Sequence, residues 1–107
     1  MRKITKDAIR AFYAGKSFKR GNTKVRVFID YAWDMEHNRK RVQLVLHGNV
    51  IAEYVNGGDL IISNGGWSSN TTKERLNGLT GVHIKQKDFV WYLNGEAWNG
   101  DWIRIGD

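Results

Sequence analysis

Apolar residues near the N-terminus recur with the period of an α-helix. Thr5 has the position of an N-cap, and Gly15 has that of the glycine that follows the last turn of a helix. The intervening polar side chains lie off the apolar stripe. The pattern therefore predicts a helix from Lys6 to about Ala14. Its buried stripe would comprise Ile4, Ala8, Ala11 and Phe12.

Apolar and polar residues then alternate with the period of two that is typical of β-strands. The first strand is predicted to begin at about Lys24. Its two faces would carry Val25, Val27 and Ile29 on one side and Arg26, Phe28 and Asp30 on the other.

Three further strands are predicted in an antiparallel meander, at residues 41–47, 50–55 and 59–63. The connections are a polar loop at residues 34–40, the two-residue turn Gly48-Asn49 and a glycine-rich turn at residues 56–58. A turn at Gly48-Asn49 would pair Leu46 with Ile51. One face of the sheet would take the N-terminal helix and the other the tryptophan-rich hairpin or the second helix; which face takes which stays open.

The C-terminal segment, residues 65–105, holds four of the five tryptophans. Thr71 and Glu74 have the spacing of a capping box, and together with the neighbouring N-cap candidates Ser69 and Asn70 they predict a short helix that stops at Gly78. Two apolar runs, 82–86 and 89–93, then flank Lys87-Asp88 and predict a hairpin with a two-residue loop. The apolar face of that hairpin would carry Val82, Ile84, Phe89, Trp91 and Leu93.

Two strong turn signals follow the hairpin, Asn94-Gly95 and Asn99-Gly100. They stand too close together for a full strand between them. The doublet predicts that Trp98 and Trp102 fold back onto the same neighbourhood. Taken together, residues 1–107 are predicted to form a single small α+β domain of order αββββαββ, with an antiparallel sheet (a meander plus the C-terminal hairpin) and two short helices. A homodimer formed through an exposed sheet edge stays open.

Composition narrows the setting of the protein. The chain has 107 residues, no cysteine and no proline, so disulfides and thiolate metal sites are excluded. The N-terminus has no apolar run long enough for a signal peptide or a membrane span. These features predict a soluble cytoplasmic protein that contacts no membrane.

The sequence contains no recognisable catalytic signature. Gly15-Lys16-Ser17 resembles the end of a phosphate-binding P-loop, but the required glycine five residues before the Gly-Lys pair is replaced by Arg10. The three histidines, His37, His47 and His83, are not spaced as metal ligands. We therefore expect a non-catalytic protein with no cofactor and no metal site.

Charge is unevenly distributed along the chain. Residues 1–26 carry nine basic residues and one acid, a net charge of +8, whereas residues 27–107 carry eight basic and ten acidic residues, a net charge of −2. Clustered cations neutralise phosphates, and Phe12, Tyr13 and Phe18 would offer stacking faces for bases if they are not part of the core. Nucleic-acid binding is therefore predicted for the N-terminal quarter, through Lys6, Arg10, Lys16, Lys19, Arg20, Lys24 and Arg26.

A protein target is the rival interpretation. Thirteen aromatic residues are many for a core of this size, and three of the tryptophans lie within two residues of a glycine in turn-rich segments where exposure is expected. Tryptophan is enriched among the anchors of protein interfaces. The alternative for these residues is that they cover the open ends of a small sheet. The candidate interface residues are Trp67, Trp98 and Trp102.

Three stretches carry a resemblance: the opening KITKDAIRAFYAGKSFKRGNTKV, the central LHGN, and the tail from WSSNTTKERL to NGDWIRI. Together they resemble the small accessory proteins of tailed bacteriophages and prophages. The resemblance implies a protein made in the cytoplasm of a bacterial host, where comparable proteins bind host machinery, nucleic acid or an antiviral defence complex. Anti-CRISPR inhibitors are one such group, but many of them are acidic mimics of nucleic acid, a pattern from which the basic N-terminal quarter departs.

Overall fold

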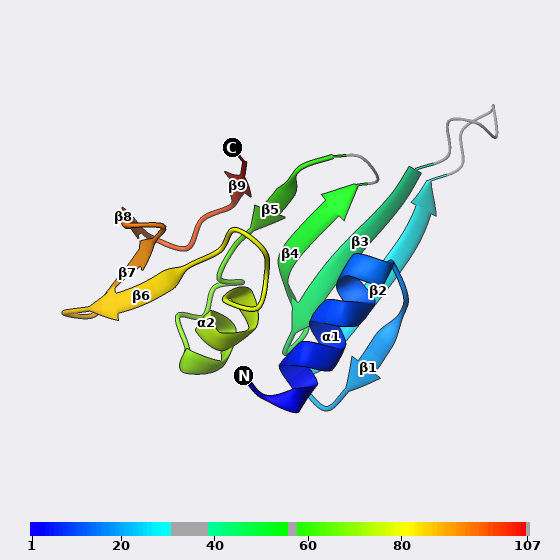
Figure 1. The fold of residues 1–107 in the computed structure, drawn as a ribbon, viewed down its shortest axis with the longest axis horizontal. Coiled ribbons are helices and arrows are strands. Elements are labelled where there is room, and N and C mark those ends of the chain that lie inside the picture. The colour runs from blue at the N-terminus through cyan, green and yellow to red at the C-terminus, as the bar shows by residue number, and fades with distance from the viewer. Residues whose placement is uncertain (31–38, 56–57, 107) are drawn as a thin grey trace.

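The computed structural model describes residues 1–30, 39–55 and 58–106 (Figure 1). Within these ranges the chain forms two helices and nine strands. The elements are α1 (Lys3–Ala14), β1 (Phe18–Arg20), β2 (Thr23–Asp30), β3 (Arg39–Leu46), β4 (Asn49–Val55), β5 (Leu60–Ile62), α2 (Asn70–Leu76), β6 (Ile84–Lys87), β7 (Val90–Leu93), β8 (Glu96–Trp98) and β9 (Ile103–Ile105).

The strands form two antiparallel sheets. The larger sheet has the order β1-β2-β3-β4-β5-β9, and the smaller one has the order β6-β7-β8. The predicted α+β class is confirmed, and the predicted meander corresponds to β2 through β5. Three short strands were missed: β1, β8 and β9. Of these, β9 is the most consequential, because it pairs with β5 and thereby ties the C-terminal segment to the larger sheet.

Helix α1 begins earlier than the sequence predicted. Its N-cap is Arg2, which makes no side-chain capping bond, and the backbone N–H of Lys6 donates to the Arg2 carbonyl. The predicted N-cap, Thr5, lies inside the helix and is buried. Its hydroxyl bonds to the side chain of Glu74, so it does not cap the helix N-terminus. The end of the helix is as predicted: Gly15 adopts the left-handed conformation, with φ 65°.

The turn between β3 and β4 lies one residue before its predicted position. His47 and Gly48 both have positive φ, so they form the two-residue turn and Leu46 pairs with Asn49. A bulge follows, and Leu44 then pairs with Ala52. The predicted pairing of Leu46 with Ile51 is therefore wrong. The polar loop at residues 34–38 and the turn residues 56–57 lie outside the described residues.

Helix α2 is capped by Ser69, whose hydroxyl accepts from the backbone N–H of Thr72. Ser69 was one of the three N-cap candidates. The capping box of Thr71 and Glu74 is not formed, because Glu74 turns toward α1. The helix ends at Leu76, and Asn77 next to it both donates to and accepts from the backbone of Ile84, which fixes the start of β6.

The hairpin of β6 and β7 forms in a different register from the predicted one. Ile84 pairs with Leu93, and the turn consists of Asp88 and Phe89 in place of Lys87 and Asp88. Phe89 was expected on the apolar face and is instead exposed at the turn. The other four residues of that face are buried as predicted: Val82, Ile84, Trp91 and Leu93.

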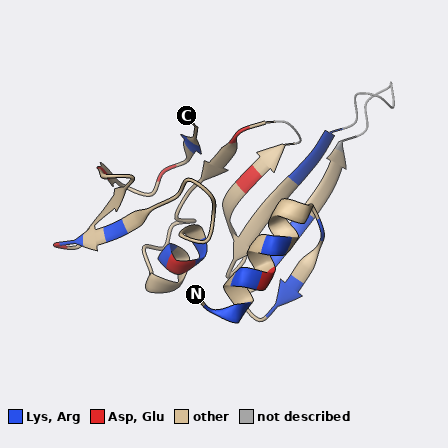
Figure 2. Cartoon of the chain, viewed as in Figure 1, with Lys and Arg blue, Asp and Glu red and all other residues tan. Residues whose placement is uncertain are grey.

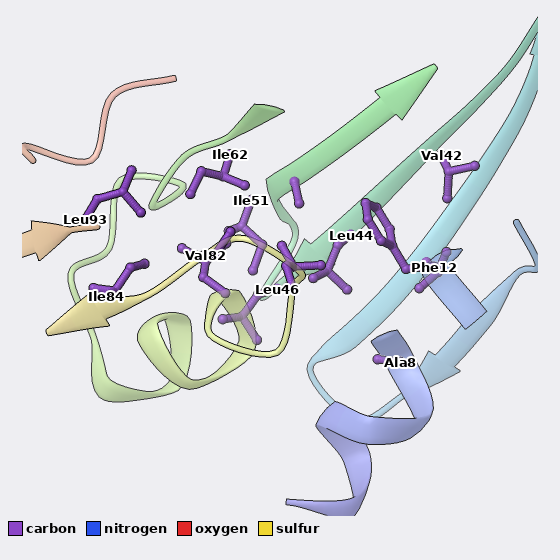
Figure 3. Close-up of a cluster of buried hydrophobic side chains, with 14 of the residues drawn as sticks. Ala8, Phe12, Val42, Leu44, Leu46, Ile51, Ile62, Val82, Ile84 and Leu93 are labelled. Atoms are coloured by element: carbon purple, nitrogen blue, oxygen red, sulfur yellow. The ribbon is translucent and has the colours of Figure 1, made fainter. Parts of the chain in front are cut away.

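One continuous core joins the two sheets (Figure 3). Phe12 of α1 packs over the face of β2 and β3 that carries Val25 and Leu44, and the same cluster continues through Leu76 of α2 to Trp91 in the smaller sheet. Figure 1 shows α1 lying across the larger sheet. The two helices lie on the same face of the larger sheet, because Arg75 of α2 bonds to Thr23 of β2 and to Thr5 of α1. Figure 1 shows the smaller sheet beside the larger one. This corrects the expectation that the second helix or the tryptophan-rich hairpin would cover the face opposite α1.

Candidate nucleic-acid interface

The other face of the larger sheet is rich in basic residues. In β2, Lys24, Arg26 and Phe28 alternate with the core residues and point away from α1. Their partners in register share this side: Lys19 lies beside Lys24, and Arg41 lies beside Phe28. Arg39, two residues before Arg41 in β3, also belongs to it, opposite Asp30. We call this surface the open face, and its basic residues are Lys19, Lys24, Arg26, Arg39 and Arg41.

An aromatic ring lies among these cations. The guanidinium of Arg41 is 5.0 Å from the centroid of the Phe28 ring, and Phe28 is 38% exposed. Glu53 is the only acid among the described side chains of β1 to β4 on this face. It accepts a hydrogen bond of 2.9 Å from Gln43 and lies 3.8 Å from Arg41. Lys19, Arg26 and Arg39 are exposed, so their charges are available to a ligand.

A second group of cations surrounds Asp7 on α1. Arg20 donates to the Asp7 carboxylate at 2.7 Å, and Lys3 and Arg10 lie 3.8 Å and 3.7 Å from it. The hydrogen bond from Arg20, with the nearby charges of Lys3 and Arg10, holds the pKa of Asp7 below its usual value. Arg20 is directed to this side because it pairs with Thr23, a core-facing position of β2.

Five of the seven predicted nucleic-acid residues divide between two sites. Lys19, Lys24 and Arg26 lie together on the open face, whereas Arg20 joins Arg10 at Asp7 on the side of α1. Lys6 and Lys16 are exposed, on α1 and just beyond it. Figure 2 shows basic residues on α1, β1 and the first part of β3, and none on β4 (Asn49–Val55) or β5 (Leu60–Ile62).

Sequence reasoning missed Arg39 and Arg41 as members of the basic surface. Arg39 was assigned to a loop, whereas β3 begins at this residue and the ladder to β2 extends to Asp30. The alternation of Arg39 and Arg41 around Lys40 was the available signal. Of the three aromatic candidates, Phe12 is fully buried and Phe18 packs against the core, while Tyr13 is half exposed. Phe28 is the aromatic residue that lies among the cations.

The three candidate tryptophans also differ in their surroundings. Trp67 is 65% exposed and Trp102 is 51% exposed, as expected. Trp98 is only 9% exposed: its ring packs 6.2 Å from that of Trp91, and its indole N–H donates to the carbonyl of Asp101. The expected exposure of Trp98 is therefore wrong, because the turn at Asn94-Gly95 pairs β8 with β7 and places Trp98 beside Trp91. An open groove lined by Asn49, Asn64 and other residues lies beside Trp102.

Other candidate chemistry is sparse in the described ranges. They contain no group of three His, Cys, Asp or Glu side chains that could hold a metal ion. His47 is exposed and lies 3.3 Å from the Asn22 side chain, His83 is exposed, and His37 lies outside the described residues. None of the helices described here is long and apolar enough to span a membrane.

The sequence was compared with models of known protein families, and one family matches. The sequence model of the Kyanoviridae Gp96 protein family matches residues 1–105. The chain belongs to this family. It is thus a phage protein, in line with the resemblance seen in the sequence, and the match specifies no activity. Searches of curated proteins and of solved structures gave no match.

Proposed function

We propose that this Gp96 family protein binds nucleic acid through the open face of its larger sheet. The observation that carries the proposal is the alignment of five basic residues from three adjacent strands on a face that neither helix covers. Glu53 is the one acid among the described side chains of β1 to β4 on this face, so the described cations outnumber the described anions there. Such clusters attract polyanions by neutralising phosphates and releasing their counterions.

The dimensions of the face suit a nucleic-acid backbone. Alternate residues of a strand lie roughly 6.8 Å apart and neighbouring strands about 4.8 Å apart, so the five cations span a patch of about 10 by 20 Å. Contacts of this kind go to phosphates and carry little sequence preference. Phe28 and the Arg41 guanidinium beside it add the combination of aromatic ring and cation on which unpaired bases stack.

The proposal is tested with two variants that remove the same charge. The open-face variant carries Lys19→Ala, Lys24→Ala and Arg26→Ala, and the control carries Lys6→Ala, Arg10→Ala and Lys16→Ala on the α1 side. Binding to fluorescein-labelled single-stranded and duplex DNA is measured by anisotropy over a range of salt concentrations. We expect the open-face variant to bind more weakly, with a slope of log K against log salt that is shallower by about 2 to 3.

The control should retain most of its affinity, and circular dichroism should show both variants folded. Equal losses in the two variants would mean that net charge, and not the open face, governs binding. Absence of binding by the unaltered protein to DNA and to RNA at low salt would refute the proposal.

A host or antiviral-defence protein is the second candidate partner. The observation that favours it is the exposure of Trp67 and Trp102 at grooves that share Asn49 in their linings. An exposed tryptophan beside a groove is a typical interface anchor. Co-purification from the bacterial host after nuclease treatment tests this alternative. A partner that is retained by the unaltered protein and lost on Trp67→Ala or Trp102→Ala would support it.

A further inference from the structure

The tip of the β6–β7 hairpin carries the most exposed large apolar side chain among the described residues. Phe89 is 96% exposed, and Val90 next to it is 41% exposed. Figure 1 shows the hairpin projecting from the body of the molecule at one end of its long axis. Phe89 packs against no part of the described core, so its side chain contributes nothing to the stability of the fold through burial.

The backbone at this tip is also strained. Asp88 has φ 52° and Phe89 has φ 67°, a conformation that glycine adopts freely and a bulky residue adopts at a cost in free energy. In two other two-residue turns of the chain, His47-Gly48 and Asn94-Gly95, both residues also have positive φ. Each of these turns has glycine at its second position, where the hairpin tip has Phe89. A glycine at position 89 would remove the strain and the exposed ring together. Strain held with no packing in return is typical of functional positions.

The surface around Phe89 is basic and aromatic. The pairing of Lys85 with Tyr92 and of Lys87 with Val90 places these side chains on the hairpin face opposite Ile84 and Trp91, which are buried. Lys85 and Lys87 are both exposed. The acid at the tip is Asp88, which occupies the turn itself. A protruding ring flanked by two lysines and a tyrosine combines a stacking surface with phosphate-binding charges.

We propose that the hairpin tip is a second contact for nucleic acid, at which Phe89 stacks on unpaired bases and Lys85 and Lys87 bind the flanking phosphates. The inference rests on the proposed function and adds the class of ligand: a single strand, because bases in a duplex present no free face to an aromatic side chain. An apolar pocket on a protein would accept the Phe89 ring. It would not bind the charged groups of Lys85 and Lys87, whereas the phosphates of a nucleic acid would.

The test compares Phe89→Gly with the unaltered protein in anisotropy measurements on a labelled twenty-nucleotide oligo(dT). We expect affinity to fall roughly five- to a hundredfold, as for the loss of one stacked base, with the salt slope unchanged. The melting temperature should rise, since glycine suits this turn, so unfolding cannot explain the weaker binding. A Lys85→Ala, Lys87→Ala variant should also bind more weakly, with a shallower salt slope.

Trp102→Ala, which removes an exposed aromatic ring from the segment just before β9, serves as the control and should bind as before. Full affinity in Phe89→Gly would overturn the inference while leaving the open-face proposal intact. If Phe89→Gly loses oligonucleotide affinity while the open-face variant keeps full affinity, the open-face proposal is wrong. Loss of a nuclease-resistant protein partner in Phe89→Gly, with oligonucleotide affinity unchanged, would reassign the tip to protein docking.

Discussion

On the covered face of the larger sheet Arg75 is fully buried, whereas on the open face Arg26 and Arg39 stand in solvent. Arg75 donates from Nε to the Thr23 hydroxyl at 3.2 Å and from Nη1 to the Thr5 hydroxyl at 2.7 Å, and it also pairs with Glu74. It thereby joins α1, α2 and β2 at one point. The open face has cations from three strands and one acid among the described side chains of β1 to β4.

The difference shows that burial and pairing separate structural cations from cations available to a ligand. A charge removed from water needs partners, and Arg75 has them on three elements. Those same partners make it unavailable for binding. Within residues 1–30, 39–55 and 58–106, the ion pair of an open-face cation is that of Arg41 with Glu53, and Lys19, Arg26 and Arg39 are exposed. These are the cations that we propose for phosphate binding. Two matched pairs of substitutions, an aromatic pair and an arginine pair, test this separation.

The largest effect is expected from the aromatic pair Phe12 and Phe28. Phe12 is fully buried and packs edge-on against Tyr54, with the ring centroids 4.9 Å apart. Phe12→Ala should lower the free energy of unfolding by about 3–5 kcal/mol. Phe28→Ala, on the open face, should cost about 1 kcal/mol or less and should weaken nucleic-acid binding instead. Urea denaturation measures the first effect and anisotropy the second. Similar destabilisation by both substitutions would show that the open face is also structural.

The arginine pair Arg75 and Arg26 should give the next largest difference. Arg75→Ala leaves the hydroxyls of Thr5 and Thr23 and the carboxylate of Glu74 without their common partner, so we expect a loss of about 3 kcal/mol in unfolding free energy. Arg26→Ala should change that free energy by less than about 0.5 kcal/mol. Thermal melts of both variants would measure the contrast, and a stable Arg75→Ala protein would contradict the structural role given to this residue.

The two faces also differ in how far the sequence predicted them. Alternation in residues 24–30 placed Arg26 and Phe28 on the side away from Val25, because a strand obeys a strict period of two. The buried role of Arg75 could not be predicted, because its partners Thr5 and Thr23 are 70 and 52 residues away along the chain. The local sequence pattern predicts on which face of a strand a side chain lies. It does not predict which side chains of distant elements come into contact.

The same limit explains the errors at the turns. Lys87-Asp88 and Asp88-Phe89 are equally short loops, and turn preferences favour neither strongly, since phenylalanine is unusual at positive φ. The structure adopts the register that pairs Ile84 with Leu93 and buries both. Asn94-Gly95, which matches the preferred turn sequence, was identified correctly and forms as expected. Tertiary packing therefore decided the register where local preference was weak.

The smallest effect is expected at Tyr54, which joins the covered face to α1. Its hydroxyl donates to the carbonyl of Phe12 at 2.5 Å, so Tyr54→Phe should lower the free energy of unfolding by about 1 kcal/mol.

Burial, with a smaller effect from Tyr13, raises the pKa of Tyr54 above its usual 10.0. Because the raised pKa favours the neutral phenol in the folded protein, this contribution is complete below pH 10 and is lost as the pH rises through the folded pKa. The stability difference between the unaltered protein and Tyr54→Phe should therefore shrink at high pH, as measured by urea denaturation at pH 8 and pH 11. A constant difference would mean that the phenol proton does not hold β4 against α1.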